Sequence, residues 1–210
     1  MFEQVLPGHT KEYLALLAKK KILPSKTYLA GGTAIALQLG HRISFDLDFF
    51  TPQKFNEEVV LGNLKKIKGF KLERSVWQTI VGKFPGCKFS LFYYQYRLIG
   101  KIIDYRGVTI ASPEDLVASK IAAISSLGAK RDFIDLYYLL QSKRVGDLSD
   151  CLKFYDQRFE NLASQRLHIL KSLDYFADAN QEKDEPKMLV KDYSWEKVKD
   201  FLREETRKLI

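Results

Sequence analysis

The feature that most constrains the fold is a short apolar strand that runs through two glycines into a helix. Residues 27–30 read as the strand, Gly31 and Gly32 break it, and 33–39 reads as a helix that ends at Gly40. A junction of this kind leaves bare backbone N–H groups at a helix N-terminus, where the helix dipole favours an anion. The stretch therefore predicts a phosphate-binding loop in an α/β fold.

Two aspartates follow the glycines on a predicted strand over 44–50. Asp46 and Asp48 alternate with apolar residues, and alternate residues of a strand share one face, so the two carboxylates project together. Such a pair is repulsive unless a cation lies between its members. Oxygen ligands suit Mg²⁺, which also bridges to substrate phosphates. Glycines and aspartates together predict a site for a metal-bound triphosphate; the alternative is an ordinary turn beside a solvated strand.

The pattern of predicted elements changes at Ser112. Before it, the periodicity predicts helices over 10–21, 33–39 and 56–67 and strands over 27–30, 44–50, 70–77, 79–84 and 87–96. Ser112 and Pro113 then begin a helix, because serine caps well and proline suits the first helical position. Beyond it we predict only helices, over 113–126, 131–142, 147–159, 162–177 and 194–208, with a linker over 178–192. We expect an α/β core over 1–110 and a helical part over 111–210 that completes an active-site cleft.

Composition excludes several classes of protein. The 210 residues are 46% hydrophobic and 29% charged, as in ordinary folded domains. A net charge of +8 weakly favours a polyanionic partner such as nucleic acid or a nucleotide. Cys87 and Cys151 stand far apart and the three histidines are scattered, so no disulfide framework or zinc motif is present. We find no apolar run of membrane-spanning length and no signal peptide, so we expect a cytoplasmic protein with no membrane partner.

Two blocks of this sequence resemble a known family. The first runs from Gly31-Gly32-Thr33-Ala34 to Asp46-Leu47-Asp48; the second joins Ala111-Ser112-Pro113-Glu114-Asp115-Leu116, Lys120 and Lys130-Arg131-Asp132-Phe133-Ile134-Asp135. In this order they look like the signature of the AbiEii/AbiGii toxin family of nucleotidyltransferases. The resemblance implies an α/β (α+β) fold, with a polymerase-β-like nucleotidyltransferase core around a mixed sheet and a helical C-terminal part.

The resemblance also implies roles for particular residues. Asp46 and Asp48 would be catalytic and would bind Mg²⁺ or Mn²⁺. The triphosphate side of the site would be formed by Gly31, Gly32, Thr33 and Lys120. Lys120 and Asp135 would be further catalytic residues. From the sequence, Arg42 either binds phosphate or fixes the aspartate strand.

The predicted reaction is the metal-dependent transfer of a nucleoside monophosphate from an NTP to a hydroxyl of RNA, tRNA or protein. Because family members include toxins, a cognate antitoxin is a further expected partner. The alternative is a catalytically lapsed nucleotide- or RNA-binding module that acts through a partner protein. Two departures from the family pattern motivate this alternative. The predicted strand 87–92 lacks the third carboxylate that such enzymes usually carry, and the nearest acidic residue is Asp104. Leu127 stands where relatives often have arginine.

Helical periodicity makes further predictions about the second block. Lys120 falls inside the apolar stripe of helix 113–126, so it needs an anionic partner unless it snorkels to the rim. Arg131 precedes Asp135 by one turn and is positioned to pair with it. We expect Lys120 and Asp135 to line one cleft with the aspartate pair, with Arg42 and Lys130 at its rim.

An aromatic and basic run lies between the two blocks. It comprises Tyr93, Tyr94, Tyr96 and Arg97. Aromatic side chains beside cations stack on the bases of single-stranded nucleic acid. The alternative is a strand that packs against the helical part.

Overall fold

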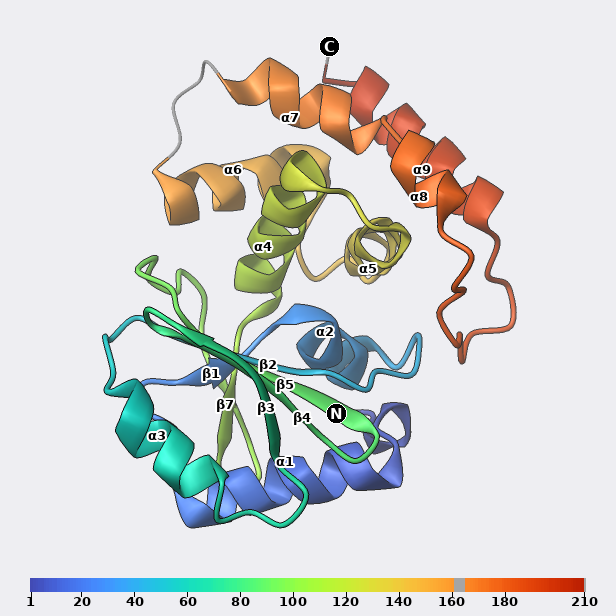
Figure 1. Cartoon of the computed structure of the whole chain (residues 1–210). Helices are drawn as coiled ribbons and strands as arrows, with labels where there is room; N and C mark the ends of the chain where they lie inside the picture. Colours follow the sequence, from blue (N-terminus) through green and yellow to red (C-terminus); the bar gives the residue numbers. More distant parts are fainter. Residues whose placement is uncertain (161–164, 210) are drawn as a thin grey trace.

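A seven-stranded mixed sheet supports the molecule, in the order β3-β4-β5-β2-β1-β7-β6 (Figure 1). The computed structural model describes residues 1–160 and 165–209. The strands are β1 (Tyr28–Leu29), β2 (Leu47–Thr51), β3 (Lys71–Val76), β4 (Thr79–Phe84), β5 (Cys87–Tyr93), β6 (Ile103–Tyr105) and β7 (Val108–Ile110). β2 runs parallel to β5 and antiparallel to β1, and β1 runs parallel to β7. The sheet is therefore mixed, as predicted.

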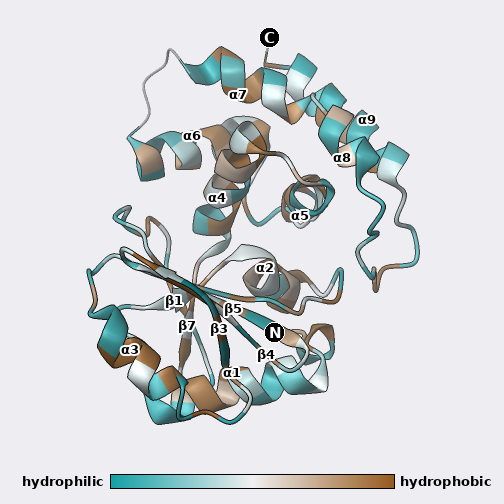
Figure 2. Cartoon of the chain, viewed as in Figure 1, coloured by the Kyte–Doolittle hydropathy of each residue, from teal (hydrophilic) through white to brown (hydrophobic). Residues whose placement is uncertain are grey.

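Helices cover both faces of the sheet. α1 (Gly8–Lys20) and α3 (Glu57–Leu64) lie on one face, and α2 (Gly31–Leu39) lies on the other, beneath the helical half of the chain (Figure 1). That half contains α4 (Pro113–Ser126), α5 (Lys130–Gln141), α6 (Leu148–Phe159), α7 (Arg166–Leu173), α8 (Ala177–Gln181) and α9 (Trp195–Arg207). A short 3-10 helix, η1 (Glu3–Val5), lies at the N-terminus of the chain. Hydrophobic residues gather on the central strands, whereas α9 is mostly hydrophilic (Figure 2). No helix among the described residues has the length and apolar character needed to cross a bilayer.

The helix start predicted at Ser112 is confirmed to the residue. The Ser112 hydroxyl accepts a hydrogen bond from the Asp115 amide, and Pro113 occupies the first turn of α4. Both features are encoded within four consecutive residues, which is why local pattern alone located this helix.

The structure differs from the predicted elements in the helical half and at one edge of the sheet. The helix predicted over 162–177 is divided into α7 and α8, and its residues 162–164 lie outside the described part of the chain. The division occurs where Phe176 turns inward to pack on Phe133 and Trp195. The predicted strands miss the β6–β7 hairpin, whose turn residues Arg106 and Gly107 both have positive φ.

The stretch predicted as a linker holds more structure than expected. Its first residues belong to α8, and its later residues pair with the loop that follows α2. The Ile43 amide donates to the Lys187 carbonyl (2.8 Å), and the Leu189 amide donates to the His41 carbonyl (2.8 Å). This extended segment therefore holds the backbone around Arg42.

A buried ion pair joins the helical half to the sheet. Arg158 on α6 and Asp115 on α4 lie 2.5 Å apart (Nη1 to Oδ1), and both side chains are inaccessible to solvent. Arg158 also donates to the Tyr28 hydroxyl on β1 (3.1 Å). Asp115 accepts from the backbone amides of Ile99 (2.9 Å) and Gly100 (3.1 Å). One carboxylate thus connects α4, α6 and the segment that leads to β6.

Removing this carboxylate should destabilise the whole chain. In Asp115→Ala, Arg158 keeps a buried charge without its anion, and we expect the free energy of unfolding to fall by about 3–5 kcal/mol. Urea unfolding followed by circular dichroism measures the change. Asp150→Ala is the control, because Asp150 pairs with Lys153 on the exposed surface of α6 and should cost under about 1 kcal/mol. A similar small loss in both variants would contradict the prediction.

Candidate active site

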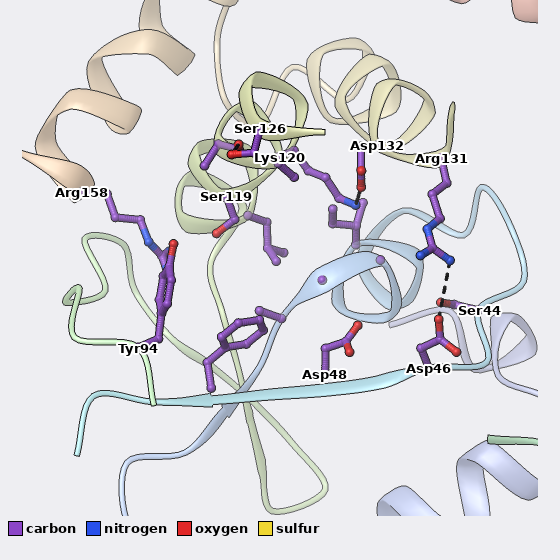
Figure 3. A pocket seen from close by; sticks show the side chains of 18 of the residues that line it. Ser44, Asp46, Asp48, Tyr94, Ser119, Lys120, Ser126, Arg131, Asp132 and Arg158 are labelled. Atoms are coloured by element: carbon purple, nitrogen blue, oxygen red, sulfur yellow. Dashed lines mark hydrogen bonds and ion pairs between the residues drawn. The ribbon is translucent and has the colours of Figure 1, made fainter. Parts of the chain in front are cut away.

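A cavity of about 400 Å³ lies between the sheet and the helical half (Figure 3). Its walls come from the β1–α2 junction, β2, the residue after β5, and helices α4, α5 and α6. The predicted site residues that line it are Gly31, Gly32, Arg42, Asp46, Asp48 and Lys120. A cavity of this size matches those that bind small ligands. Segments far apart in the sequence thus meet around one space.

The side chains packed against Gly31 and Gly32 leave no room for a Cβ at either position, and the turn at Gly31 also favours glycine. Gly31 has φ +65°, and a Cβ there would lie 2.9 Å from Asp48 Oδ2; a Cβ on Gly32 would lie 2.0 Å from Arg42 Nη2. Ala30, the N-cap residue of α2, offers no side chain to the first amides of the helix. The helix N-terminus therefore faces the cavity with amides that suit an anion.

Thr33 supports the loop from below and does not line the cavity. Its hydroxyl hydrogen bonds with the hydroxyl of Ser44 (2.8 Å) and contacts the Asp46 carbonyl, and its side chain is buried. The expectation that Thr33 belongs to the triphosphate side is therefore wrong for its side chain. It fixes the backbone that carries Asp46.

Strand β2 carries Asp48, and Asp46 immediately precedes its first residue; both predicted metal ligands line the cavity (Figure 3). Asp48 lies opposite Ser90 of β5 in the parallel register, and Ser90 donates to Asp48 Oδ1 (2.7 Å). Asp46 lies 3.7 Å from the guanidinium of Arg131. Burial raises the pKa of Asp48, and the nearby charge of Asp46 raises it further against the hydrogen bond from Ser90. Among the described residues, no lysine or arginine forms a salt bridge with Asp48.

The charges around the cavity favour a bound cation. Four cationic side chains line the cavity (Arg42, Lys120, Arg131 and Arg158). The carboxylates that line it or pair with these cations number five (Asp46, Asp48, Asp115, Asp132 and Asp135), which leaves one negative charge in excess. Within residues 1–160 and 165–209, no three His, Cys, Asp or Glu side chains gather as a metal site. The aspartate pair therefore fits a hard cation that takes its other ligands from water and phosphate, as Mg²⁺ does.

Asp135 lies beneath the cavity, and the expectation that it lines the cleft is wrong. Its side chain is fully buried and accepts from Arg42 Nε (2.7 Å) and Nη2 (2.8 Å), and it lies 2.8 Å from both the Lys120 ammonium and His41 Nε2. Burial opposes its charge, but Arg42 and Lys120 outweigh burial and hold the pKa of Asp135 well below its usual range. Asp135 is thus a positioning residue for two cations.

Lys120 is buried and charged, as its place in the apolar stripe predicted. Its ammonium lies 2.6 Å from Asp132 and 2.8 Å from Asp135. Burial alone would lower the pKa of Lys120, yet the two carboxylates raise it above its ordinary value. The snorkelling alternative is excluded, because only a small part of the side chain reaches solvent.

Other expected partners differ in the structure. Arg131 pairs with Asp46 and not with Asp135, since Arg42 and Lys120 already surround the Asp135 carboxylate. Arg42 is used mainly to fix the loop, although its guanidinium borders the cavity. Lys130 is turned away toward Glu185 (2.6 Å) and is not a rim residue.

Asp104 does not supply the missing third carboxylate. It is exposed on β6, at the edge of the sheet, three strands away from β2. The position opposite Asp48 is Ser90. A carboxylate from a neighbouring strand is therefore lacking at this site in the described chain.

Many residues of the cavity wall were not predicted to lie there, and Arg131, Asp132, Tyr94 and Arg158 are among them. Arg131 and Asp132 stand beside the predicted Asp135, but helical spacing alone does not reveal which of three polar residues faces the cavity. Tyr94 and Arg158 form the far end, where the Arg158 guanidinium lies 5.9 Å from the Tyr94 ring centroid. Tyr94 and Tyr96 also contact Phe159 of α6, so this part of the aromatic run packs on the helical half.

Comparisons with known proteins give a family model and a sequence relative. A family model described as "Nucleotidyl transferase AbiEii toxin, Type IV TA system" matches residues 15–111 and 95–201. The uncharacterized protein aq_aa25 of Aquifex aeolicus (strain VF5) is 35% identical over 188 residues, 87% of either chain.

Two solved structures share the fold at low sequence identity. JHP933 from Helicobacter pylori has a TM-score of 0.56 and 18% identity over 97% of this chain and 93% of its own. MenT4, nucleotidyltransferase toxin Rv2826c from Mycobacterium tuberculosis H37Rv, has a TM-score of 0.55 and 17% identity over 95% and 82%. The expected fold class, a polymerase-β-like nucleotidyltransferase core followed by helices, is confirmed.

The raised pKa of Asp48 predicts a stabilising substitution. A buried carboxylate whose pKa is raised costs stability above that pKa, and the cost disappears as pH falls below the unfolded value of about 3.9. Asp48→Asn should therefore raise the melting temperature by a few degrees at pH 7 in EDTA, since about 1 kcal/mol corresponds to 2–4 °C at this size. Differential scanning fluorimetry measures it, with Asp104→Asn as the control. A lower melting temperature for Asp48→Asn would contradict the electrostatic account.

The lowered pKa of Asp135 predicts the opposite effect. A carboxylate with a depressed pKa stabilises the fold above its unfolded pKa, and this contribution is lost as pH falls through about 3.9 toward the folded value. Asp135→Asn should lower the free energy of unfolding by about 3–5 kcal/mol at pH 7. The difference from wild type should shrink below about pH 4. Urea titrations at both pH values test this, and a loss that stays the same at both would refute the charge-based role.

Proposed function

Because the chain belongs to the AbiEii family of nucleotidyl transferase toxins, we propose that this cavity transfers a nucleoside monophosphate from an NTP to a hydroxyl of RNA, tRNA or protein. One observation carries the proposal: the N-terminus of α2, the Asp46 and Asp48 pair and the buried Lys120 border a single cavity. A phosphate-binding helix end, a cation site and a fixed ammonium are the parts that an NTP requires.

In the proposed reaction, the acceptor hydroxyl oxygen attacks the α-phosphorus of the NTP. The new oxygen–phosphorus bond forms as the bond from the α-phosphorus to the bridging oxygen of the β-phosphate breaks. Pyrophosphate leaves with that oxygen, and the hydroxyl proton passes to solvent water. The described chain supplies no strand carboxylate opposite Asp48 to accept the proton.

The residues of the chain balance charge and hold groups in place. Asp46 and Asp48 would hold Mg²⁺ or Mn²⁺, and such an ion neutralises triphosphate charge when it is bound. The α2 amides, Lys120 and Arg131 balance negative charge on the leaving phosphates. Asp132 and Asp135 keep the Lys120 ammonium in one position, so little reorganisation is needed when the nucleotide binds.

A second candidate follows from Ser90. With serine in place of a third carboxylate opposite Asp48, the chain is alternatively a catalytically lapsed module that binds a nucleotide or RNA and acts through a partner protein. The two candidates differ in one measurable respect, because only the first turns over NTP.

Transfer should depend on both aspartates. Wild-type protein incubated with each α-³²P-labelled NTP, Mg²⁺ or Mn²⁺ and total RNA or protein should label one acceptor. Asp46→Asn and Asp48→Asn should reduce labelling on the order of 10²–10³-fold, the loss seen when one preorganised stabilising group is removed. Asp104→Asn, far from the cavity, should label as wild type does. Nucleotide binding without labelling by the wild type would refute transfer and support the lapsed module.

The toxin role has its own readout. If the enzyme acts as a toxin, induced expression of the wild type should arrest bacterial growth and expression of Asp46→Asn should not. Co-expression of a cognate antitoxin should restore growth of the cells that express the wild-type protein.

A further inference from the structure

The cavity has two chemically different ends (Figure 3). Asp46, Asp48, Lys120, Arg131 and Asp132 gather at one end. Tyr94, Arg158 and Ser119 lie toward the other end. The apolar residues of the lining are Ala30, Ile35, Phe50, Leu116, Ala122 and Ala123, and Phe50 among them packs against Tyr94. On the proposed function, the charged end receives the triphosphate. The apolar end is then the space left for the rest of the nucleotide.

Tyr94 provides a fixed aromatic surface at the apolar end. Its ring packs edge-on against Phe50 (centroids 5.5 Å apart) and Tyr96 (5.1 Å). These contacts hold the ring in position. An aromatic ring bordering an apolar space suits a flat, π-bearing group such as a nucleobase.

Arg158 at this end does not compete with the charged end for phosphate. Its guanidinium is paired with buried Asp115 and donates to Tyr28, so its charge is already balanced inside the protein. It lies against the Tyr94 ring, 5.9 Å from the centroid. A buried cation whose charge is paired with Asp115 lies beside the aromatic ring and leaves the phosphates to the α2 N-terminus.

Ser119 supplies a hydrogen-bond acceptor beside this surface. Its hydroxyl donates to the Asp115 carbonyl (2.9 Å). A carbonyl can only accept, so the hydroxyl hydrogen is used and the oxygen retains its lone pairs. Figure 3 shows this oxygen directed toward the Tyr94 end of the cavity. An acceptor there complements the amino group of adenine or cytosine and opposes the keto oxygen of guanine or uracil.

We infer that the apolar end is a nucleobase subsite in which Tyr94 stacks on the base and Ser119 selects adenine and cytosine, the bases with an amino group where guanine and uracil have a keto oxygen. The inference rests on the proposed function, because it assumes that the triphosphate occupies the charged end. It assigns a selectivity that the fold alone does not determine.

The stacking role is tested by binding to full-length protein with Mg²⁺ and no acceptor. Isothermal titration with ATP, CTP and inorganic tripolyphosphate compares the two ends of the cavity. Tyr94→Ala should weaken ATP and CTP about 5–150-fold, from a stacking contribution of roughly 1–3 kcal/mol, and should leave tripolyphosphate unchanged. Tyr94→Phe, which keeps the ring, should bind as wild type does. Unchanged nucleotide affinity in Tyr94→Ala, or an equal loss for tripolyphosphate, would overturn the stacking role.

The selective role is tested by pairs of nucleotides that differ at the amino position. The wild-type protein should bind CTP about tenfold more tightly than UTP, and ATP about tenfold more tightly than GTP. Such a difference corresponds to one good hydrogen bond. Ser119→Ala should bring both ratios close to one. Ser125→Ala is the matched control, since Ser125 donates to the Ala122 carbonyl (3.0 Å) on the same helix but does not line this cavity. Equal binding of all four nucleotides by wild type, or ratios unaffected by Ser119→Ala, would overturn selection.

These measurements separate the inference from the function on which it rests. If wild type binds tripolyphosphate and NTPs but Tyr94 and Ser119 have no effect, the nucleobase subsite is wrong and the proposed function stands. If neither tripolyphosphate nor any NTP binds, both fail together.

Discussion

The candidate site depends on one buried carboxylate. Asp135 is sealed from solvent and binds Arg42 and Lys120 together. A buried carboxylate is tolerated only when its charge is matched and its lone pairs are satisfied. Each cation comes from a different part of the chain: Arg42 from the loop after α2 and Lys120 from α4. Their common partner on α5 therefore sets how the sheet, α4 and α5 meet.

This arrangement explains why the cavity can hold opposite charges side by side. Asp135 and Asp132 keep Lys120 charged although it is buried. The Arg42 guanidinium approaches the backbone of Gly32 so closely that a Cβ there would lie 2.0 Å from Nη2, so only glycine fits at this position. The surrounding network thus fixes the α2 N-terminus and the ammonium before any ligand arrives, and a ligand has little ordering left to impose.

The same logic separates residues that touch a ligand from residues that hold others in place. Family resemblance put Asp135 among the catalytic residues, but its full burial makes it a support. Asp132, three positions earlier on the helix, lines the cavity instead. Arg131 takes the surface position from which it reaches Asp46. One turn of α5 contains all three, and only its contact with α2 and α4 decides which side chain faces which way.

Much of the molecule followed from local sequence. Gly-Gly after a strand, alternating aspartates, and Ser-Pro at a helix start are each encoded within a few residues, so the glycine junction before α2, the aspartate pair and the start of α4 were located correctly. The resemblance to the AbiEii family rested on the same short blocks and is confirmed. What the sequence could not determine was pairing across distance: that Asp135 takes Arg42 and not Arg131, that the segment around Lys187 holds the Arg42 loop, and that Tyr94 and Ser119 share a wall with the aspartates. These pairings join positions up to about 150 residues apart. Burial and charge neutralisation select them in the folded chain, and no short-range pattern records the outcome.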